Sequence, residues 1–179
     1  MATVVGIDPS LTSAGVAVLT DGQITSIEHF GFTGTNHPTW QFRSRRVRWV
    51  CAQVAAVLAT HNVDLVVIEG IPEHGKILPS TLDRAGLWHG LYGVADHDDT
   101  PIAVMNPSTL KAWTTGSGSA KKAAMLAQVR GWFPAQRITC DDEADAIALA
   151  LTGAFHLGDP MPFEVKPRHT TGLEKVAWP

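Results

Sequence analysis

The sequence predicts an α/β fold in which a mixed five-stranded sheet is flanked by helices. Short apolar stretches around a hairpin turn at Asp21-Gly22 open the chain, which is typical of antiparallel strands. Later apolar stretches alternate with helical patterns, as they do where helices connect parallel strands. The 179 residues suffice for one domain with a buried core, and we assign residues 1–158 to it. Residues 159–179 contain four prolines and are expected to form an irregular tail.

The first three strands are expected at residues 3–7, 14–19 and 23–32. Apolar residues fill the first two stretches, and an imperfect alternation of apolar and polar residues continues through the third. Turn-forming residues separate the first stretch from the second. The three strands should therefore pair antiparallel.

Helices and parallel strands are expected in the rest of the domain. Residues 40–59 predict a helix because apolar side chains recur there at helical spacing, at Val47, Val50, Cys51, Val54 and Leu58. Residues 64–68 predict a strand buried on both faces. The later elements are a helix over 81–95, a strand over 101–105, a turn at 107–111, a helix that opens at 116–119 and runs to 133, and a helix over 141–158.

The composition excludes several classes of protein. Hydrophobic residues make up 45% of the chain and charged residues 17%, so wholesale disorder is not expected. No apolar run approaches the roughly 20 residues that cross a bilayer, and the first residues enter a strand rather than a secretion signal. Cys51 and Cys140 are too few for a disulfide framework and lack the spacing of a zinc motif. We therefore expect a cytoplasmic protein.

The net charge of −3 is unusual for a protein that binds nucleic acid, because neutralising phosphates supplies much of the affinity. A cluster of carboxylates that binds divalent cations would explain the excess, since the bound metal offsets the negative charge. The charge is therefore weak evidence against nucleic-acid binding.

Four carboxylates occupy places where a rigid element begins or ends. Asp8 follows the first strand, and Glu69 follows the strand over 64–68. Asp142 and Asp145 are three residues apart in the first turn of the last helix and share one face. Converging carboxylates can hold Mg²⁺, which prefers oxygen ligands. Each acid also has a structural alternative, as a turn residue, an exposed strand end, a helix cap or a first-turn acid.

Four motifs, in this order along the chain, resemble those of the RuvC family. They are Gly6-Ile7-Asp8-Pro9 with Gly15, Val67-Ile68-Glu69, Gly118-Ser119-Ala120-Lys121-Lys122, and Asp-Glu-Ala-Asp-Ala-Ile-Ala-Leu-Ala over 142–150. The resemblance extends from about residue 4 to residue 152. It implies an RNase H-like fold and a structure-selective endonuclease that resolves four-way (Holliday) DNA junctions by paired symmetric nicks.

The resemblance also implies which residues carry the chemistry. The catalytic positions fall on Asp8, Glu69, Asp142, Asp145 and Lys122. The four acids would hold two Mg²⁺ ions, for which Mn²⁺ should substitute, and two-metal hydrolysis would leave 5′-phosphate and 3′-hydroxyl ends. Because 141–143 is a run of three acids, Asp141 stays open as an alternative to Asp142.

Basic and polar residues supply candidate DNA contacts. Lys121 and Lys122 follow a glycine-serine turn whose N–H groups could bind a phosphate, although a solvated lysine pair explains them equally well. The resemblance places Lys111 near the scissile phosphate. The full set of candidate DNA contacts is Lys76, Arg84, Lys111, Ser119, Lys121 and Lys122. The loop over 70–76 lacks an aromatic wedge, so the way the junction is opened and any base preference stay open.

The resemblance implies a homodimer, and the helix over 81–95 offers a surface for it. Gly86, Gly90 and Gly93 recur at helical spacing, although glycine inside a helix costs about 1 kcal/mol relative to alanine. Close approach of a second copy would explain them, with Leu82 at the flank. An early end of the helix is the alternative.

The sequence is also compatible with two other functions to different degrees. The strand-turn-strand over 5–18 also resembles actin-like ATPases, but that architecture needs two such domains and leaves the acid pair of the last helix without a role. An RNase H-like nuclease that acts on RNA or on other branched DNA would keep the fold and change the substrate. Neither an organic cofactor nor a membrane is expected.

Overall fold

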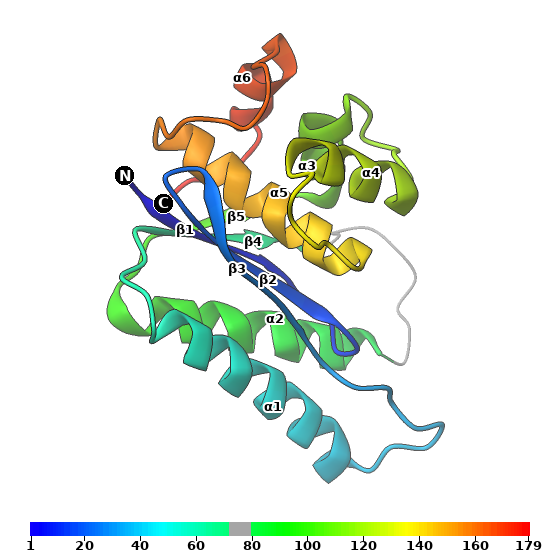
Figure 1. The fold of residues 1–179 in the computed structure, drawn as a ribbon. Helices are drawn as coiled ribbons and strands as arrows, with labels where there is room; N and C mark the ends of the chain where they lie inside the picture. The colour runs from blue at the N-terminus through cyan, green and yellow to red at the C-terminus, as the bar shows by residue number, and fades with distance from the viewer. Residues whose placement is uncertain (72–79) are drawn as a thin grey trace.

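The computed structural model describes residues 1–71 and 80–179 and confirms the mixed five-stranded sheet. The strands lie in the order β3-β2-β1-β4-β5. β1, β2 and β3 are antiparallel, while β1, β4 and β5 run parallel (Figure 1). Their bounds are β1 Thr3–Asp8, β2 Ala14–Thr20, β3 Gln23–Phe30, β4 Leu65–Glu69 and β5 Ile102–Met105.

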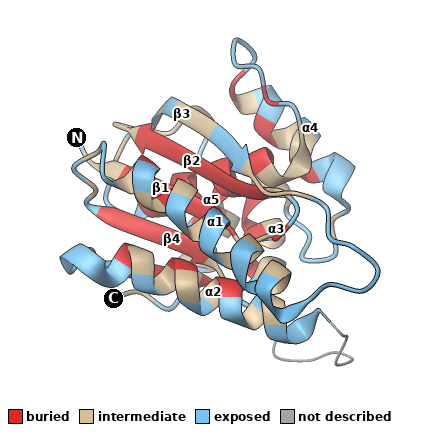
Figure 2. Cartoon of the chain, turned by 90° about the horizontal axis from the view of Figure 1, so that it is seen from below, coloured by how far each residue is buried: buried red, intermediate tan, exposed pale blue. Residues whose placement is uncertain are grey.

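Helices cover both faces of the sheet. The helices α1 (Trp40–Leu58) and α2 (Thr81–Ala95) lie on one face, and a short 3₁₀ turn over Asp96–Asp98 follows α2. On the other face lie α3 (Pro107–Thr115), α4 (Lys122–Trp132) and α5 (Asp141–His156). Figure 2 shows the strands β1, β2 and β4 buried between these layers. No helix in the described ranges is long and apolar enough to cross a bilayer.

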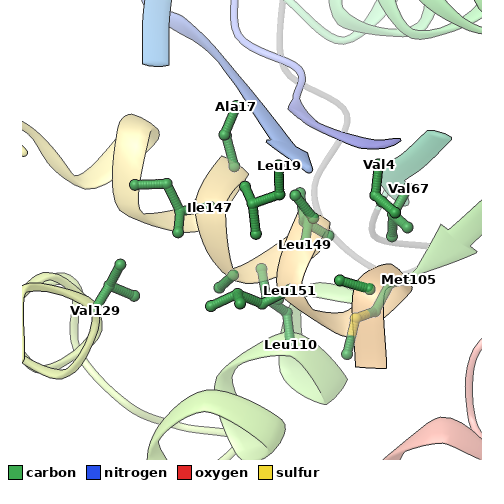
Figure 3. Close-up of a cluster of buried hydrophobic side chains, with 14 of the residues drawn as sticks. Val4, Ala17, Leu19, Val67, Met105, Leu110, Val129, Ile147, Leu149 and Leu151 are labelled. Carbon is green, nitrogen blue, oxygen red and sulfur yellow. The ribbon is translucent and has the colours of Figure 1, made fainter. Parts of the chain in front are cut away.

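The two faces of the sheet form two hydrophobic clusters. In β1, Val4 points into the cluster beneath α5, and its neighbour Val5 points into the cluster beneath α1 and α2. Figure 3 shows the first cluster, in which strand residues meet Ile147, Leu149 and Leu151 of α5. The central strand is therefore buried on both sides, as expected for a strand with neighbours on each edge.

The helix α3 was not expected, and the start of α4 was expected too early. Pro107 fits the first position of a helix, because its missing N–H needs no partner there. Leu110 and Trp113 are then buried, but nine residues are too few for a clear periodicity. Gly116 ends α3 in the left-handed conformation at φ 92°, so the glycine-serine segment closes one helix instead of opening the next.

The segment after residue 158 is ordered, which corrects the expectation of an irregular tail. It contains α6 (Pro167–Leu173), whose buried His169 accepts a hydrogen bond on its carbonyl oxygen from Trp113 Nε1 at 3.1 Å. Ala177 then exchanges two backbone hydrogen bonds with Val104 and so adds an antiparallel bridge at β5. Aromatic packing against α3 and pairing at the sheet edge hold this segment in place.

Candidate active site

Two carboxylates meet at one edge of the sheet. Asp8 ends β1 and Glu69 ends β4, and these two strands are parallel neighbours with Ile7 opposite Ile68. The next residue of each strand is an acid. Because side chains alternate between the two faces and the strands are in register, both acids point to the same face. The end of the β1–β4 pair therefore carries two adjacent carboxyl groups.

Glycines let α5 bring two further acids to this edge. Gly15 lies opposite Asp8 in β2, and a Cβ built on Gly15 would lie 2.0 Å from the carbonyl oxygen of Asp142. A Cβ on Gly6 would lie 2.0 Å from the carbonyl oxygen of Ala146. Any side chain at either position would displace the helix. The close approach places the first turn of α5, with Asp142 and Asp145, beside the strand ends.

The four acids, which we call the carboxylate centre, repel one another in a poorly solvated place. Burial raises the pKa of Asp8 well above its ordinary value, and the charges of Glu69, Asp145 and Asp142 raise it further. Burial, followed by the charge of Asp145, raises the pKa of Glu69 to about 7. The pKa of Asp145 rises to about 6 through burial and the neighbouring Asp141. Full ionisation of the centre therefore requires compensating positive charge.

The donors of the centre fit a hard divalent cation. The Oδ1 atom of Asp145 is buried and has no hydrogen-bond partner in the described part of the chain. A buried polar atom without a partner is costly, and a bound cation would satisfy it. All four side chains offer carboxylate oxygens, the ligands that Mg²⁺ prefers.

Three basic side chains act on the carboxylate centre. Lys122, the first residue of α4, lowers the pKa of Asp8, and Lys111 of α3 lowers that of Glu69. Arg84 of α2 lowers the pKa of Glu69 as well. Of the other candidate DNA contacts, Lys121 and Ser119 lie exposed at the start of α4 and in the loop before it. Lys76 lies outside the described residues.

Asp141 and Asp142 differ in their partners. Asp141 forms an ion pair with Lys122. The hydrogen bond from this lysine holds the pKa of Asp141 below its ordinary value. Asp142 instead contributes to the raised pKa of Asp8. The charges of both acids thus act on the carboxylate centre, that of Asp142 on Asp8 and Asp145 and that of Asp141 on Asp145, while Asp141 is also paired with Lys122.

Two residues support the site without an obvious signal in the sequence. Glu143 is buried beneath the first turn of α5 and accepts hydrogen bonds from the backbone N–H of Thr139 at 2.6 Å and from the Thr139 hydroxyl at 2.9 Å. Burial alone would raise the pKa of Glu143, but these bonds and one from His29 lower it. The second residue is Trp88, whose Nε1 donates to the carbonyl oxygen of Glu69 at 2.8 Å.

The three glycines lie on one side of α2 but differ in their surroundings. A Cβ on Gly90 would lie 2.8 Å from Sγ of Cys51 in α1, so Gly90 serves packing within the chain. Gly86 and Gly93 are exposed, and a Cβ on either would meet no atom within 4 Å. Leu82 is also exposed, at 62%. The outer face of α2 therefore carries Leu82, Gly86 and Gly93 without Gly90.

Comparisons with known proteins agree with this geometry. The family model described as crossover junction endodeoxyribonuclease RuvC matches residues 4–153. The RuvC of Saccharopolyspora erythraea is 31% identical over 153 residues, which cover 83% of this chain and 74% of that protein. The RuvC of Mycobacterium ulcerans is 32% identical over 154 residues, which cover 83% of this chain and 80% of that protein.

Solved structures give the same result. The structure of Thermus thermophilus RuvC superposes with a TM-score of 0.68 at 25% identity and covers 90% of this chain and 99% of that one. The same protein in complex with a Holliday junction substrate gives a TM-score of 0.69 at 24% identity, covering 91% and 100% of the two chains. The match over most of the domain also decides against an actin-like ATPase. Motifs, fold and comparisons together show that this chain belongs to the RuvC family of crossover junction endodeoxyribonucleases, a family of metal-dependent nucleases with an RNase H-like fold.

Proposed function

We propose that this protein resolves four-way DNA junctions by two symmetric cuts, one on each of two opposing strands. One observation supports this most directly: four carboxylates from three elements converge around a buried, unpartnered oxygen of Asp145. Relatives named crossover junction endodeoxyribonucleases and the relative solved with a Holliday junction support the choice of substrate.

Asp8, Glu69, Asp142 and Asp145 would hold two Mg²⁺ ions. When bound, the ions supply Lewis acidity toward the scissile phosphate and offset the charge of the carboxylates and of the DNA. The protein's own contribution is to hold the acids at fixed strand ends and on the first turn of a buried helix, so that no rearrangement is needed at the moment of reaction. Hydrolysis would leave 5′-phosphate and 3′-hydroxyl ends.

Lys122 would neutralise the phosphate beside the carboxylate centre. In the free protein its ammonium group is paired with Asp141 and already lowers the pKa values of Asp8 and Asp145. An incoming phosphate competes with Asp141 for this side chain, since both are anions. Lys111 adds a second positive charge beside Glu69 and Asp145. The two lysines thus supply positive charge where the acidic protein must accept DNA.

The two cuts would come from a homodimer. A twofold assembly presents two identical sites at once, and the isologous contact is the commonest way to build it. The outer face of α2, with exposed Leu82, Gly86 and Gly93, offers a flat surface for a second copy. Gly90 contributes indirectly, by seating α2 on α1.

A cleavage assay tests the substrate and the metal. A synthetic four-way junction, a linear duplex of the same sequence and an RNA–DNA hybrid are incubated with the protein and Mg²⁺, Mn²⁺ or EDTA. We expect paired nicks in the junction with either metal, no cleavage with EDTA and much slower cleavage of the other substrates. Preferred cleavage of the hybrid would assign the protein to the RNA-directed nucleases instead.

Light scattering tests the dimer. We expect a dimer for the wild type and a monomer for Gly86→Leu, which places a bulky side chain on the outer face of α2. Gly131→Leu in α4 is the matched control, because a Cβ there also meets no atom within 4 Å but lies on a different helix. A wild-type monomer that still makes paired nicks would exclude the dimer.

A further inference from the structure

Three side chains with different ligand atoms meet beside the carboxylate centre. The imidazole of His29, the thiol of Cys140 and the carboxylate of Glu143 each offer one ligand atom, and these atoms all lie within 4.8 Å of one another. Cys140 is a free thiol, and Nδ1 of His29 is 2.9 Å from Oε1 of Glu143. Nitrogen, sulfur and oxygen donors therefore already surround one point.

The fold places this group on the far side of Gly15 from the carboxylate centre. His29 in β3 lies opposite Gly15 in β2, which in turn lies opposite Asp8 in β1. Neighbouring strands are about 4.8 Å apart, so His29 and Asp8 are separated by about 10 Å across the sheet. Cys140 is the residue directly before α5, and Glu143 is in its first turn.

Hydrogen bonds orient the carboxylate of Glu143 before any metal arrives. Thr139 donates its backbone N–H and its hydroxyl to the two carboxylate oxygens of Glu143, and His29 adds a third hydrogen bond. Carboxylate ligands in metal sites are commonly oriented by such hydrogen bonds. The side chain of His29 is 49% exposed, which leaves an approach from solvent.

The donor set selects the metal. Imidazole with thiolate suits Zn²⁺, which takes four ligands in tetrahedral geometry, whereas Mg²⁺ prefers oxygen ligands alone. We propose that His29, Cys140 and Glu143 bind a zinc ion, with water in the fourth position, and that this ion ties β3 to the start of α5. On binding, the metal replaces the hydrogen bond between His29 and Glu143: the thiol releases its proton to solvent, and the imidazole holds its remaining proton on the nitrogen that does not bind the metal.

The zinc ion would connect two elements of the fold. Both anionic ligands lie at the N-terminus of α5, where the helix dipole favours negative charge. The zinc ion would join the helix that carries Asp142 and Asp145 to the edge strand β3, and so hold these acids over Gly15. The ligands lack the spacing of a zinc motif because His29 comes from β3, more than a hundred residues before the other two.

Cobalt substitution tests the site independently of cleavage. Co²⁺ bound to a thiolate gives a sulfur-to-metal charge-transfer absorption, which the all-oxygen carboxylate centre does not give. Metal-free protein, kept reduced without added thiols, is titrated with Co²⁺ and then with Zn²⁺. We expect the thiolate absorption to saturate at one cobalt per chain, apart from any cobalt at the carboxylate centre, and to disappear when Zn²⁺ displaces it. The rise in melting temperature with zinc should be smaller in Cys140→Ser than in the wild type.

Three variants test the assignment of ligands. Cys140→Ser should abolish the thiolate absorption, and His29→Gln should weaken metal binding by at least about tenfold. Cys51→Ser is the control, since Cys51 lies in α1 beside Gly90 and should leave the absorption unchanged. Absence of the absorption in the folded wild type, or its persistence in Cys140→Ser, would overturn the zinc site. Either result leaves the proposed cleavage of junctions untouched.

Discussion

The acids at the start of α5 fall into two groups that differ in their partners. Asp141 and Glu143, the flanking acids, are held by Lys122 and by Thr139 with His29, and their pKa values lie below the ordinary range. Asp145, in the carboxylate centre, has a buried oxygen without a partner and a pKa raised to about 6. Acids of the two groups alternate along the chain over the first one and a half turns of α5.

This difference distinguishes acids that already have hydrogen-bond partners within the protein from an acid whose buried oxygen is left without one. Hydrogen bonds to the flanking acids stabilise the first turn of α5 without any metal. Burial and mutual repulsion in the carboxylate centre destabilise the metal-free protein, which is the usual cost of a preorganised site. Proximity in sequence says little about role, because the partner of each acid decides it.

The sharpest test of this contrast is cleavage by two matched variants. Asp145→Asn removes one charge from the carboxylate centre, and we expect the rate of junction cleavage to fall at least about 100-fold. Asp141→Asn makes the same chemical change in a flanking acid and should keep the rate within a few-fold. Single-turnover cleavage with Mg²⁺ measures both rates, and equal losses would remove the distinction.

The partner of Asp141 provides the next test. Lys122→Ala should lower the cleavage rate roughly tenfold or more, because a charge beside the scissile phosphate is lost. Junction affinity, measured by gel shift in Ca²⁺, should change only modestly, since one phosphate contact among many is removed. A proportional loss of affinity and rate would make Lys122 a residue that only docks DNA.

Substitutions in the two groups of acids should change the free energy of unfolding in opposite directions. Glu143→Gln disrupts the bonds to Thr139 and His29 and should lower the free energy of unfolding by about 1–2 kcal/mol. Asp145→Asn relieves repulsion and should raise it in the metal-free protein. Urea denaturation in EDTA compares the two variants with the wild type. Destabilisation by both would mean that Asp145 also has a structural partner.

The last test is the dependence of stability on pH. Because Glu69 and Asp145 keep their protons up to pKa values of about 7 and about 6 in the folded state, the unfolded chain loses protons first as the pH rises. Their contribution to stability is thus present at about pH 4 and lost by about pH 7. The flanking acids act oppositely and lose their contribution at lower pH, as they become protonated. Melting curves of metal-free wild type and Glu69→Gln measure this, and the variant should show a flatter profile between pH 4 and 7.

The sequence predicted the sheet, the long helices and the convergence of strand-end acids, because these depend on local patterns. Gly15 is part of the motif that contains Asp8, and the structure gives the reason for the glycine: α5 passes so close that a side chain would collide with it. The helix α3 and the order of the last segment escaped prediction, since both depend on Trp113 and the aromatic side chains that pack on it from distant parts of the chain. The contact of Gly90 with α1 could not be predicted for a similar reason, because it depends on Cys51, which is distant in the sequence.

The helix α5 carries the proposed metal ligands in its first turns and is buried along nearly all of the remainder. Residues of this helix that follow Asp145 fill the space between the sheet and α3 and α4 (Figure 3). Local opening requires that few buried contacts be broken, so this helix should exchange its amide hydrogens only when the whole domain unfolds. The carboxylate centre should therefore stay intact until the hydrophobic core unfolds. Substitutions that adjust activity should be tolerated better in the exposed segments around the centre than within it.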